Sequence, residues 1–167
     1  MDCYLAATLK SLCRSILVIG YGNLLRSDDG IGQQIAQSVA AWGMPNVQTI
    51  AIHQLTPELA ETLETFDIVI FVDAYPISDY QDIQIKLINS SQFNPIMGHT
   101  GDPRSLLALA QALYNRVPQT WWVIVPGVNF EVGDRLSSIA EHHIEIALQK
   151  IDHLIQTVRT EPCTKSE

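Results

Sequence analysis

Short runs of aliphatic and β-branched residues alternate along the chain with segments in which apolar residues recur at helical spacing. This alternation is typical of a mostly parallel sheet that is covered by helices on both faces. Uninterrupted runs such as IVIFV and WWVIV indicate strands buried on both faces, whereas IQIKLIN alternates and contains Lys86, as an edge strand would. The pattern predicts five strands, at Ile16–Tyr21, Val47–Ile52, Ile68–Val72, Ile83–Ile88 and Trp121–Val125. We therefore expect an α/β fold, a three-layer α/β/α single domain on a twisted, mostly parallel five-stranded sheet.

Four helices are predicted between and after these strands. The first spans about Asp29–Trp42, where apolar residues recur every three or four positions, and the last spans about Ser137–Val158. The other two begin at TPEL and at DPRSLL, where Pro stands in the first helical position. The predicted N-caps are Thr56, Asp102 and Ser138, the last spaced from Glu141 as in a capping box.

The 167 residues are enough for one sizeable core and too few for two. No repeat or Pro/Gly-rich linker divides the chain, so we expect a single domain over residues 1–167, with a core at about 15–158 and flexible ends at 1–14 and 160–167. Two connections are long, Asp73–Asp82 and Asn89–Asp102. Loops of this length in a compact domain often carry function.

The formal net charge of −8 argues against binding to nucleic acid, because no Lys/Arg cluster is present to neutralise phosphates. The three cysteines, Cys3, Cys13 and Cys163, form no C-x-x-C pair, which suggests a reducing compartment. The N-terminal segment lacks the charge order of a secretory signal, and no apolar run is long enough to span a bilayer. We expect a soluble, cytoplasmic protein, a monomer, whose partner is a protein or a small molecule.

The segment GYGNLLRSDDGIG lies between the first strand and the first helix, where nucleotide-binding proteins place their phosphate loops. It does not fit a dinucleotide fingerprint, because Leu25 replaces the third glycine and the second strand ends in AIHQL without an acid. The chain has neither the G-K-[ST] of a triphosphate loop nor a G-x-S-x-G elbow. In EHHIE, His142 and Glu145 lie one turn apart without a third ligand, so we interpret them as surface residues.

Three polar residues follow successive strands. Asp29 lies after the first strand, Asp73 directly after IVIFV, and His99 in the long connection after IQIKLIN. In an open α/β sheet, ligands bind in the crevice outside the carboxyl ends of the strands, so these side chains are predicted to converge. Two carboxylates and an imidazole would suit Zn²⁺ or Ni²⁺ and leave coordination positions open.

Structural interpretations of the same residues stay open at this point. A carboxylate at a helix start stabilises the helix dipole without any further role, and we assign that role to Asp28 while Asp29 is open to both. Asp73 is either a turn acid or a site residue, because an acid after so apolar a strand needs a partner or water. His99 is either a solvated loop residue or a ligand. His53, at the end of the second strand, either lines the crevice or only closes it.

With these motifs in place, the chain resembles the maturation endopeptidases of [NiFe] hydrogenases. ILVIGYGNLLRSDDGIG resembles the opening strand, G-x-G-N and acid pair of that family, and IVIFVDA resembles its central strand ending in aspartate. GHTGDPRSLLALA corresponds to its histidine-containing segment, and GVNFEVGDRLSSIAEHHIEIAL to its late glycine loop and last helix. The resemblance runs from about Ile16 to Leu154 and keeps the order of the motifs.

The resemblance implies that Asp29, Asp73 and His99 are the metal-binding and catalytic residues. It implies removal of a C-terminal extension from a [NiFe] hydrogenase large-subunit precursor, the expected partner, after nickel has been inserted. Either the three residues bind the nickel that the precursor carries, or a bound metal such as Zn activates the hydrolysis itself. A carboxylate such as Asp29 is also a candidate general base. The alternative is a non-catalytic nickel-binding or metallochaperone module for hydrogenase assembly.

Two positions depart from the family pattern. The first acid of the triad is often Glu in the family, and Asp29 is shorter by one methylene. The late glycine is commonly followed by G-x-E-P, whereas here Val128, Asn129 and Phe130 precede Glu131. The sequence leaves open whether Glu131 is the counterpart of the family's late acid.

Overall fold

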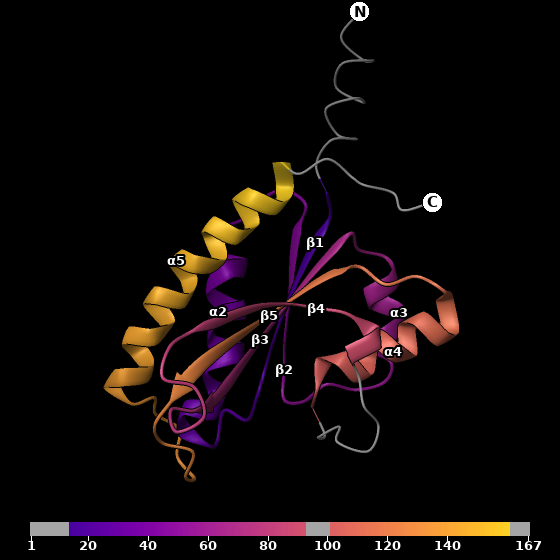
Figure 1. The fold of residues 1–167 in the computed structure, drawn as a ribbon. Coiled ribbons are helices and arrows are strands. Elements are labelled where there is room, and N and C mark those ends of the chain that lie inside the picture. The colour runs from indigo at the N-terminus through magenta and orange to yellow at the C-terminus, as the bar shows by residue number, and fades with distance from the viewer. Residues whose placement is uncertain (1–13, 93–100, 161–167) are drawn as a thin grey trace, which may run out of the picture.

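The computed structural model describes residues 14–92 and 101–160 (Figure 1). The predicted flexible ends, the three cysteines and His99 lie wholly or largely outside these ranges. The elements in chain order are β1 (Ile16–Tyr21), the 3₁₀ turn η1 (Ser27–Gly30), α2 (Ile31–Ala41), β2 (Val47–Ile52), α3 (Leu59–Glu64), β3 (Ile68–Pro76), β4 (Gln84–Ile88), η2 (Ser90–Gln92), α4 (Pro103–Tyr114), β5 (Gln119–Gly127) and α5 (Ser138–Thr160).

The five strands form one sheet in the order β2-β1-β3-β5-β4. All neighbouring pairs are parallel except β4 with β5, which is antiparallel. The predicted mostly parallel sheet is therefore confirmed, and β4 is an edge strand, as its alternating sequence indicated. The central strand β3 is buried along the whole of its apolar run, because helices cover both of its faces.

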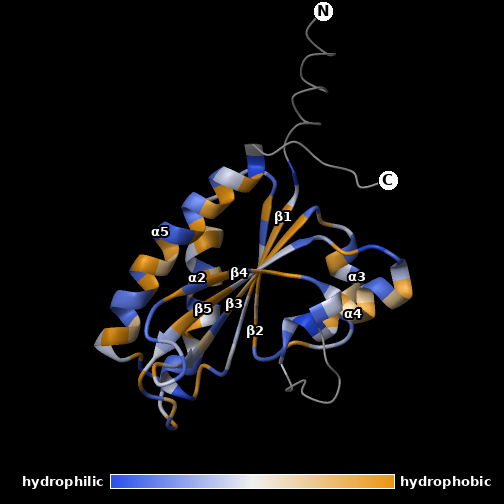
Figure 2. Ribbon diagram, viewed as in Figure 1, coloured by the Kyte–Doolittle hydropathy of each residue, from blue (hydrophilic) through white to orange (hydrophobic). Residues whose placement is uncertain are grey.

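Helices α2 and α5 cover one face of the sheet, and α3 and α4 cover the other (Figure 1). Each face has its own core: Ile31, Ile35 and Ile151 pack under the first pair of helices, and Leu63, Leu106 and Phe71 under the second. Figure 2 shows the strands largely apolar and α5 with both apolar and polar residues. The predicted three-layer α/β/α architecture is confirmed. No helix among residues 14–92 and 101–160 is long and apolar enough to cross a bilayer.

Two strands are longer than the apolar runs that predicted them. Pairing between β3 and β5 continues from Asp73 opposite Ile124 to Pro76 opposite Gly127. Backbone hydrogen bonding, unlike side-chain burial, does not require apolar residues, so the ladder extends beyond the hydrophobic run. Asp73 thus lies within a strand rather than after it, and the connection to β4 is correspondingly shorter than predicted.

Of the three N-caps predicted from the sequence, one is confirmed and two are wrong. Asp102 caps α4 as expected, because its carboxylate accepts from the backbone N–H of Arg104 at 2.9 Å. The cap predicted at Thr56 is wrong: a turn precedes α3, which begins at Leu59 without a side-chain cap. The capping box at Ser138 is wrong by one residue, since Ser137 is the cap and its Oγ accepts from the N–H of Ala140 at 3.1 Å.

The start of α2 lies directly on the end of β1 because glycines face each other there. A Cβ on Gly20 would collide with the backbone carbonyl of Gly32, and a Cβ on Gly32 would collide with the carbonyl of Tyr21. The glycines of GYGNLLRSDDGIG therefore serve close helix–sheet packing. This packing sets the acids of η1 at the carboxyl end of the sheet.

Candidate functional site

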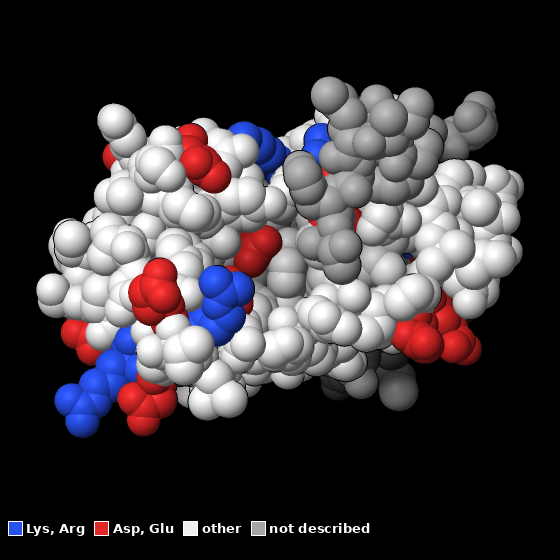
Figure 3. Space-filling view, turned by 90° about the horizontal axis from the view of Figure 1, so that it is seen from below, with Lys and Arg blue, Asp and Glu red and all other residues white. Residues whose placement is uncertain are grey.

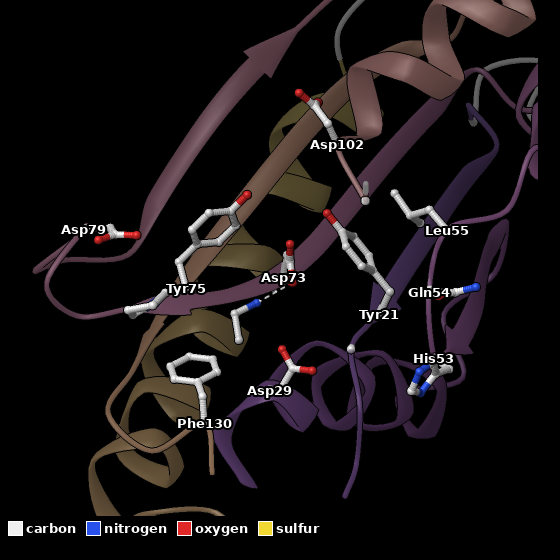
Figure 4. A pocket seen from close by; sticks show the side chains of 14 residues that line it. Tyr21, Asp29, His53, Gln54, Leu55, Asp73, Tyr75, Asp79, Asp102 and Phe130 are labelled. Carbon is white, nitrogen blue, oxygen red and sulfur yellow. Dashed lines mark hydrogen bonds between the residues drawn. The ribbon is translucent and has the colours of Figure 1, made fainter. Parts of the chain in front are cut away.

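A cavity of about 360 Å³ opens at the carboxyl ends of β1, β2 and β3 (Figure 4). In the sheet, β2 lies on one side of β1 and β3 lies on the other side. The strand order therefore reverses between β1 and β3, and the cavity lies at this point. Ligands of open α/β sheets bind at such points. Described residues that line the cavity include Tyr21, Asp29, His53, Asp73, Tyr75, Asp79, Asp102 and Phe130.

Asp29 reaches this cavity from η1 and is partly buried. Its Oδ2 accepts a hydrogen bond from the backbone N–H of Asn23 at 2.7 Å. That contact closes the loop between β1 and η1 and fixes the carboxylate at the cavity wall. Figure 4 shows Asp29 below Asp73, from a different element.

Asp73 reaches the same cavity from β3. Its Oδ1 accepts from the backbone N–H of Ala74 at 2.8 Å, the dashed line in Figure 4. Burial, with a smaller contribution from the charge of Asp29, raises the pKa of Asp73 to about 7, although the nearby Tyr21 hydroxyl and the N–H of Ala74 act to lower it. Near neutral pH this carboxyl therefore exists in both protonation states, as a group that transfers protons would.

Asp28 is not a helix cap, contrary to the sequence-based interpretation. Its side chain is fully buried and its carboxylate accepts from the N–H groups of Val128, Asn129 and Ser137 and from the Ser137 hydroxyl, at 2.7–2.9 Å. The chain first makes the 3₁₀ turn η1, so Asp28 points back to the connection between β5 and α5. Burial would raise the pKa of Asp28, but these hydrogen bonds outweigh it and the pKa is lowered.

The connection 128–137 is held beside the loop after β1 by Asp28 and by backbone bonds. The N–H of Ser27 donates to Gly133 at 2.9 Å, and the N–H of Gly133 donates to Leu25 at 2.9 Å. This pairing brings Phe130 to the cavity wall. Phe130 thus belongs to the site although it lies some hundred positions from Asp28 and Asp29 in the chain.

The acidic side chains that line the cavity differ in whether a basic side chain pairs with them. Asp102 forms a bidentate ion pair with Arg104, with the shortest contact at 2.6 Å. Among the described residues no ion pair involves Asp29 or Asp73, and the described lining of the cavity contains neither Lys nor Arg. Figure 3 shows acidic side chains in the hollow on this face of the molecule. The cavity therefore favours a cation or a neutral ligand over an anion.

No protein-family model matches the chain, and no curated protein matches it in sequence. Solved structures match it in fold. The hydrogenase maturating endopeptidase HybD from E. coli has a TM-score of 0.70 at 21% identity, with 86% of this chain and 93% of that chain covered. An endopeptidase from Escherichia coli solved in solution has 0.70 at 22% identity, covering 91% and 99%. The [NiFe] hydrogenase maturation protease HycI from Thermococcus kodakarensis KOD1 has 0.67 at 15%, covering 89% and 99%.

The chain has the fold of these peptidases. The match extends over nearly the full length of each of them, so it includes the sheet and the helices that frame the cavity.

The other residues considered in the sequence analysis lie partly at the cavity and partly away from it. His53 is exposed and lines the cavity beside Gln54, whereas His99 lies outside the described residues. Glu131 is exposed and is not among the described residues that line the cavity. His142 and Glu145 are exposed on α5, in agreement with the surface interpretation.

Within residues 14–92 and 101–160, no group of three His, Cys, Asp or Glu side chains is placed to hold a metal ion. The described part of the site supplies two carboxylates of the expected donor set, and the expected imidazole of His99 lies beyond it. A metal with three protein ligands therefore fits these residues only together with a donor from residues 93–100 or from the ligand.

Three aromatic cavity residues were not predicted from the sequence: Tyr21, Tyr75 and Phe130. Tyr75 packs edge-to-face on Tyr80 and on Trp122 and projects into the cavity from β3. The position of Tyr21 at a strand end, the same signal that singled out Asp73, was the one clue that could have identified it.

Proposed function

We propose that the chain is a hydrogenase maturation endopeptidase, which removes the C-terminal extension of a nickel-loaded [NiFe] hydrogenase large-subunit precursor. The observation that carries this proposal is the convergence of Asp29 and Asp73, from β1–η1 and β3, in one cavity at the switch point of the sheet. The neighbours in fold, which are hydrogenase maturation proteases by name, support the same assignment.

In this proposal the nickel ion belongs to the substrate. Asp29, Asp73 and His99 bind the nickel that the precursor carries and so select loaded precursors. The absence of a Lys or Arg partner for Asp29 and Asp73 in the described structure supports this role, since no basic side chain there competes with a cation for these carboxyl groups. Asp73 must lose its proton to bind the metal, and a nearby cation favours that loss.

The hydrolytic step requires a group that takes a proton from water. Asp73, with a pKa of about 7, and Asp29 beside it are the candidates in the cavity. A divalent ion such as Zn²⁺ bound at these residues would supply a water of lowered pKa. The two carboxylates would in either case orient the water against a peptide bond of the bound extension.

Substitution of the two acids tests the proposal. Asp29→Asn and Asp73→Asn keep the size of each side chain but remove its charge, and each should slow processing of a nickel-loaded precursor by about 100-fold or more. The rate is measured from the mass of the precursor over time. Glu131→Gln, an exposed acid outside the described cavity lining, should process at the wild-type rate.

Two results would contradict the proposal. Wild-type rates in both acid variants, with unchanged melting curves, would mean that Asp29 and Asp73 are only structural. A folded wild-type protein that binds nickel tightly but leaves the mass of the loaded precursor unchanged would instead be a nickel-binding module for hydrogenase assembly.

A further inference from the structure

Tyr21 occupies the last position of β1 and is rigidly held. Only 4% of the residue is exposed, and its ring packs edge-to-face on Phe71, with centroids 6.4 Å apart and an interplanar angle of 82°. The ring thus belongs to the core while the residue also lines the cavity. Figure 4 shows the hydroxyl pointing into the space between Asp73 and Asp102.

The hydroxyl of Tyr21 lacks a hydrogen-bond partner in the described structure. It lies near enough to Asp73 to lower the pKa of that carboxyl, yet no described residue meets it at hydrogen-bonding distance and angle. Buried polar groups in proteins are almost always hydrogen-bonded, because an unsatisfied one destabilises the folded state. A phenylalanine would fill the same space without an unsatisfied buried hydroxyl. The hydroxyl of Tyr21 therefore indicates that this position binds a ligand.

The surroundings define what this hydroxyl can bind. A phenol keeps its proton near neutral pH, because its ordinary pKa is about 10, so the Tyr21 hydroxyl acts as a donor. Its partner must then be an acceptor. The carboxylates of Asp29, Asp73 and Asp79 line the same cavity and repel an anionic acceptor. An uncharged carbonyl oxygen, such as that of a peptide bond, fits both requirements.

We propose that the Tyr21 hydroxyl donates a hydrogen bond to the carbonyl oxygen of the peptide bond that is cut, and stabilises the negative charge that develops there. This inference rests on the proposed endopeptidase function. Water attacks the carbonyl carbon while one of its protons passes to a cavity carboxylate. The carbon–nitrogen bond then breaks, and that proton is transferred to the leaving amine. Tyr21 keeps its own proton throughout and is a catalytic residue by its contact with the reacting oxygen.

Tyr21→Phe tests the inference, with Tyr80→Phe as the matched control. Tyr80 carries the same hydroxyl but is not among the described residues that line the cavity, and its oxygen lies 3.5 Å from Lys86 Nζ. Tyr21→Phe should lower kcat for a nickel-loaded precursor by about 100-fold, with KM changed less than about threefold, because the donor acts on charge that develops in the transition state. Its melting temperature should be equal to or above that of the wild type. Tyr80→Phe should retain the wild-type kcat.

A kcat of Tyr21→Phe within about twofold of the wild type would overturn the inference and leave the endopeptidase function standing. A clear drop in its melting temperature would overturn it as well, because the hydroxyl would then have a structural partner. If the wild-type protein cuts no precursor, the endopeptidase function itself fails, and the role of Tyr21 fails with it.

Discussion

Asp28 is fully buried and Asp73 is partly buried, and their carboxylates have opposite surroundings. Asp28 accepts four hydrogen bonds, and its pKa is lowered although burial alone would raise it. Asp73 accepts one backbone hydrogen bond and lies beside Asp29, so burial and a like charge raise its pKa to about 7. The carboxylate of Asp28 finds its hydrogen-bond donors within the protein. The ionised carboxylate of Asp73 has fewer donors, so a bound cation or a proton would stabilise it.

The raised pKa of Asp73 has a consequence for stability. In the unfolded chain this carboxyl has an ordinary pKa of about 4, so the folded chain holds the proton more tightly. The ionised carboxylate therefore costs stability above pH 7, and this cost fades as the pH falls from about 7 toward about 4. In the presence of a chelator, Asp73→Asn should melt at a higher temperature than the wild type at pH 8 and at nearly the same temperature near pH 4.

Thermal unfolding of both proteins across this pH range checks the expectation. Asp79→Asn, which changes an exposed acid at the same cavity, should leave the profile unaltered. A melting temperature of Asp73→Asn that lies below the wild type at pH 8 would show that the carboxylate is satisfied in the folded chain, and the raised pKa of Asp73 would be contradicted.

At the scale of the elements, one side chain joins two distant segments. Asp28 in η1 binds the connection between β5 and α5 at both of its ends, Val128 and Ser137, and Ser137 in turn caps α5. Backbone pairing between Arg26 and Gly133 adds to this link. The wall of the cavity that Phe130 provides thus depends on a carboxylate in the element that also carries Asp29.

Asp28→Asn should destabilise the protein by about 2–4 kcal/mol, because the amide cannot accept all four hydrogen bonds and brings a donor toward backbone N–H groups. Folding lowers the pKa of Asp28, so its carboxylate stabilises the folded chain in full at pH values above about 4, the pKa in the unfolded chain. This stabilisation is lost as the pH falls through the lower pKa that Asp28 has in the folded chain. Urea unfolding should therefore show the largest difference from the wild type at neutral pH.

Asp134→Asn provides the comparison, because Asp134 lies exposed in the same connection. It should change the free energy of unfolding by less than about 0.5 kcal/mol. A similarly small change in Asp28→Asn would mean that the four hydrogen bonds contribute little, and the link between η1 and the connection would have to be attributed to the backbone pairs alone.

For the whole molecule, the sequence predicts the sheet well. The bounds of β1 and β2 agree with the predictions because each of these strands begins and ends with an apolar or aromatic residue of its predicted segment. The edge position of β4 follows from its alternation with Lys86. The bounds of β3 and β5 are missed because hydrogen-bonded pairing continues past the buried residues, which hydrophobicity does not record.

The candidate site is predictable only where it follows from topology. Asp29 and Asp73 are brought together because parallel neighbouring strands end at the same edge of the sheet. The contacts of Asp28 with Val128 and Asn129 join residues a hundred positions apart, and no local pattern encodes them. The unsatisfied hydroxyl of Tyr21 is likewise a property of packing, which becomes visible only in three dimensions.

The central claim is that this cavity recognises the nickel of a hydrogenase precursor and that the protein then cuts the chain. The most direct test is the mass of a purified large-subunit precursor before and after incubation with the protein, once loaded with nickel and once metal-free. We expect the loaded precursor to lose the mass of its C-terminal extension and the metal-free precursor to keep its mass. Equal shortening of both precursors would contradict the claim.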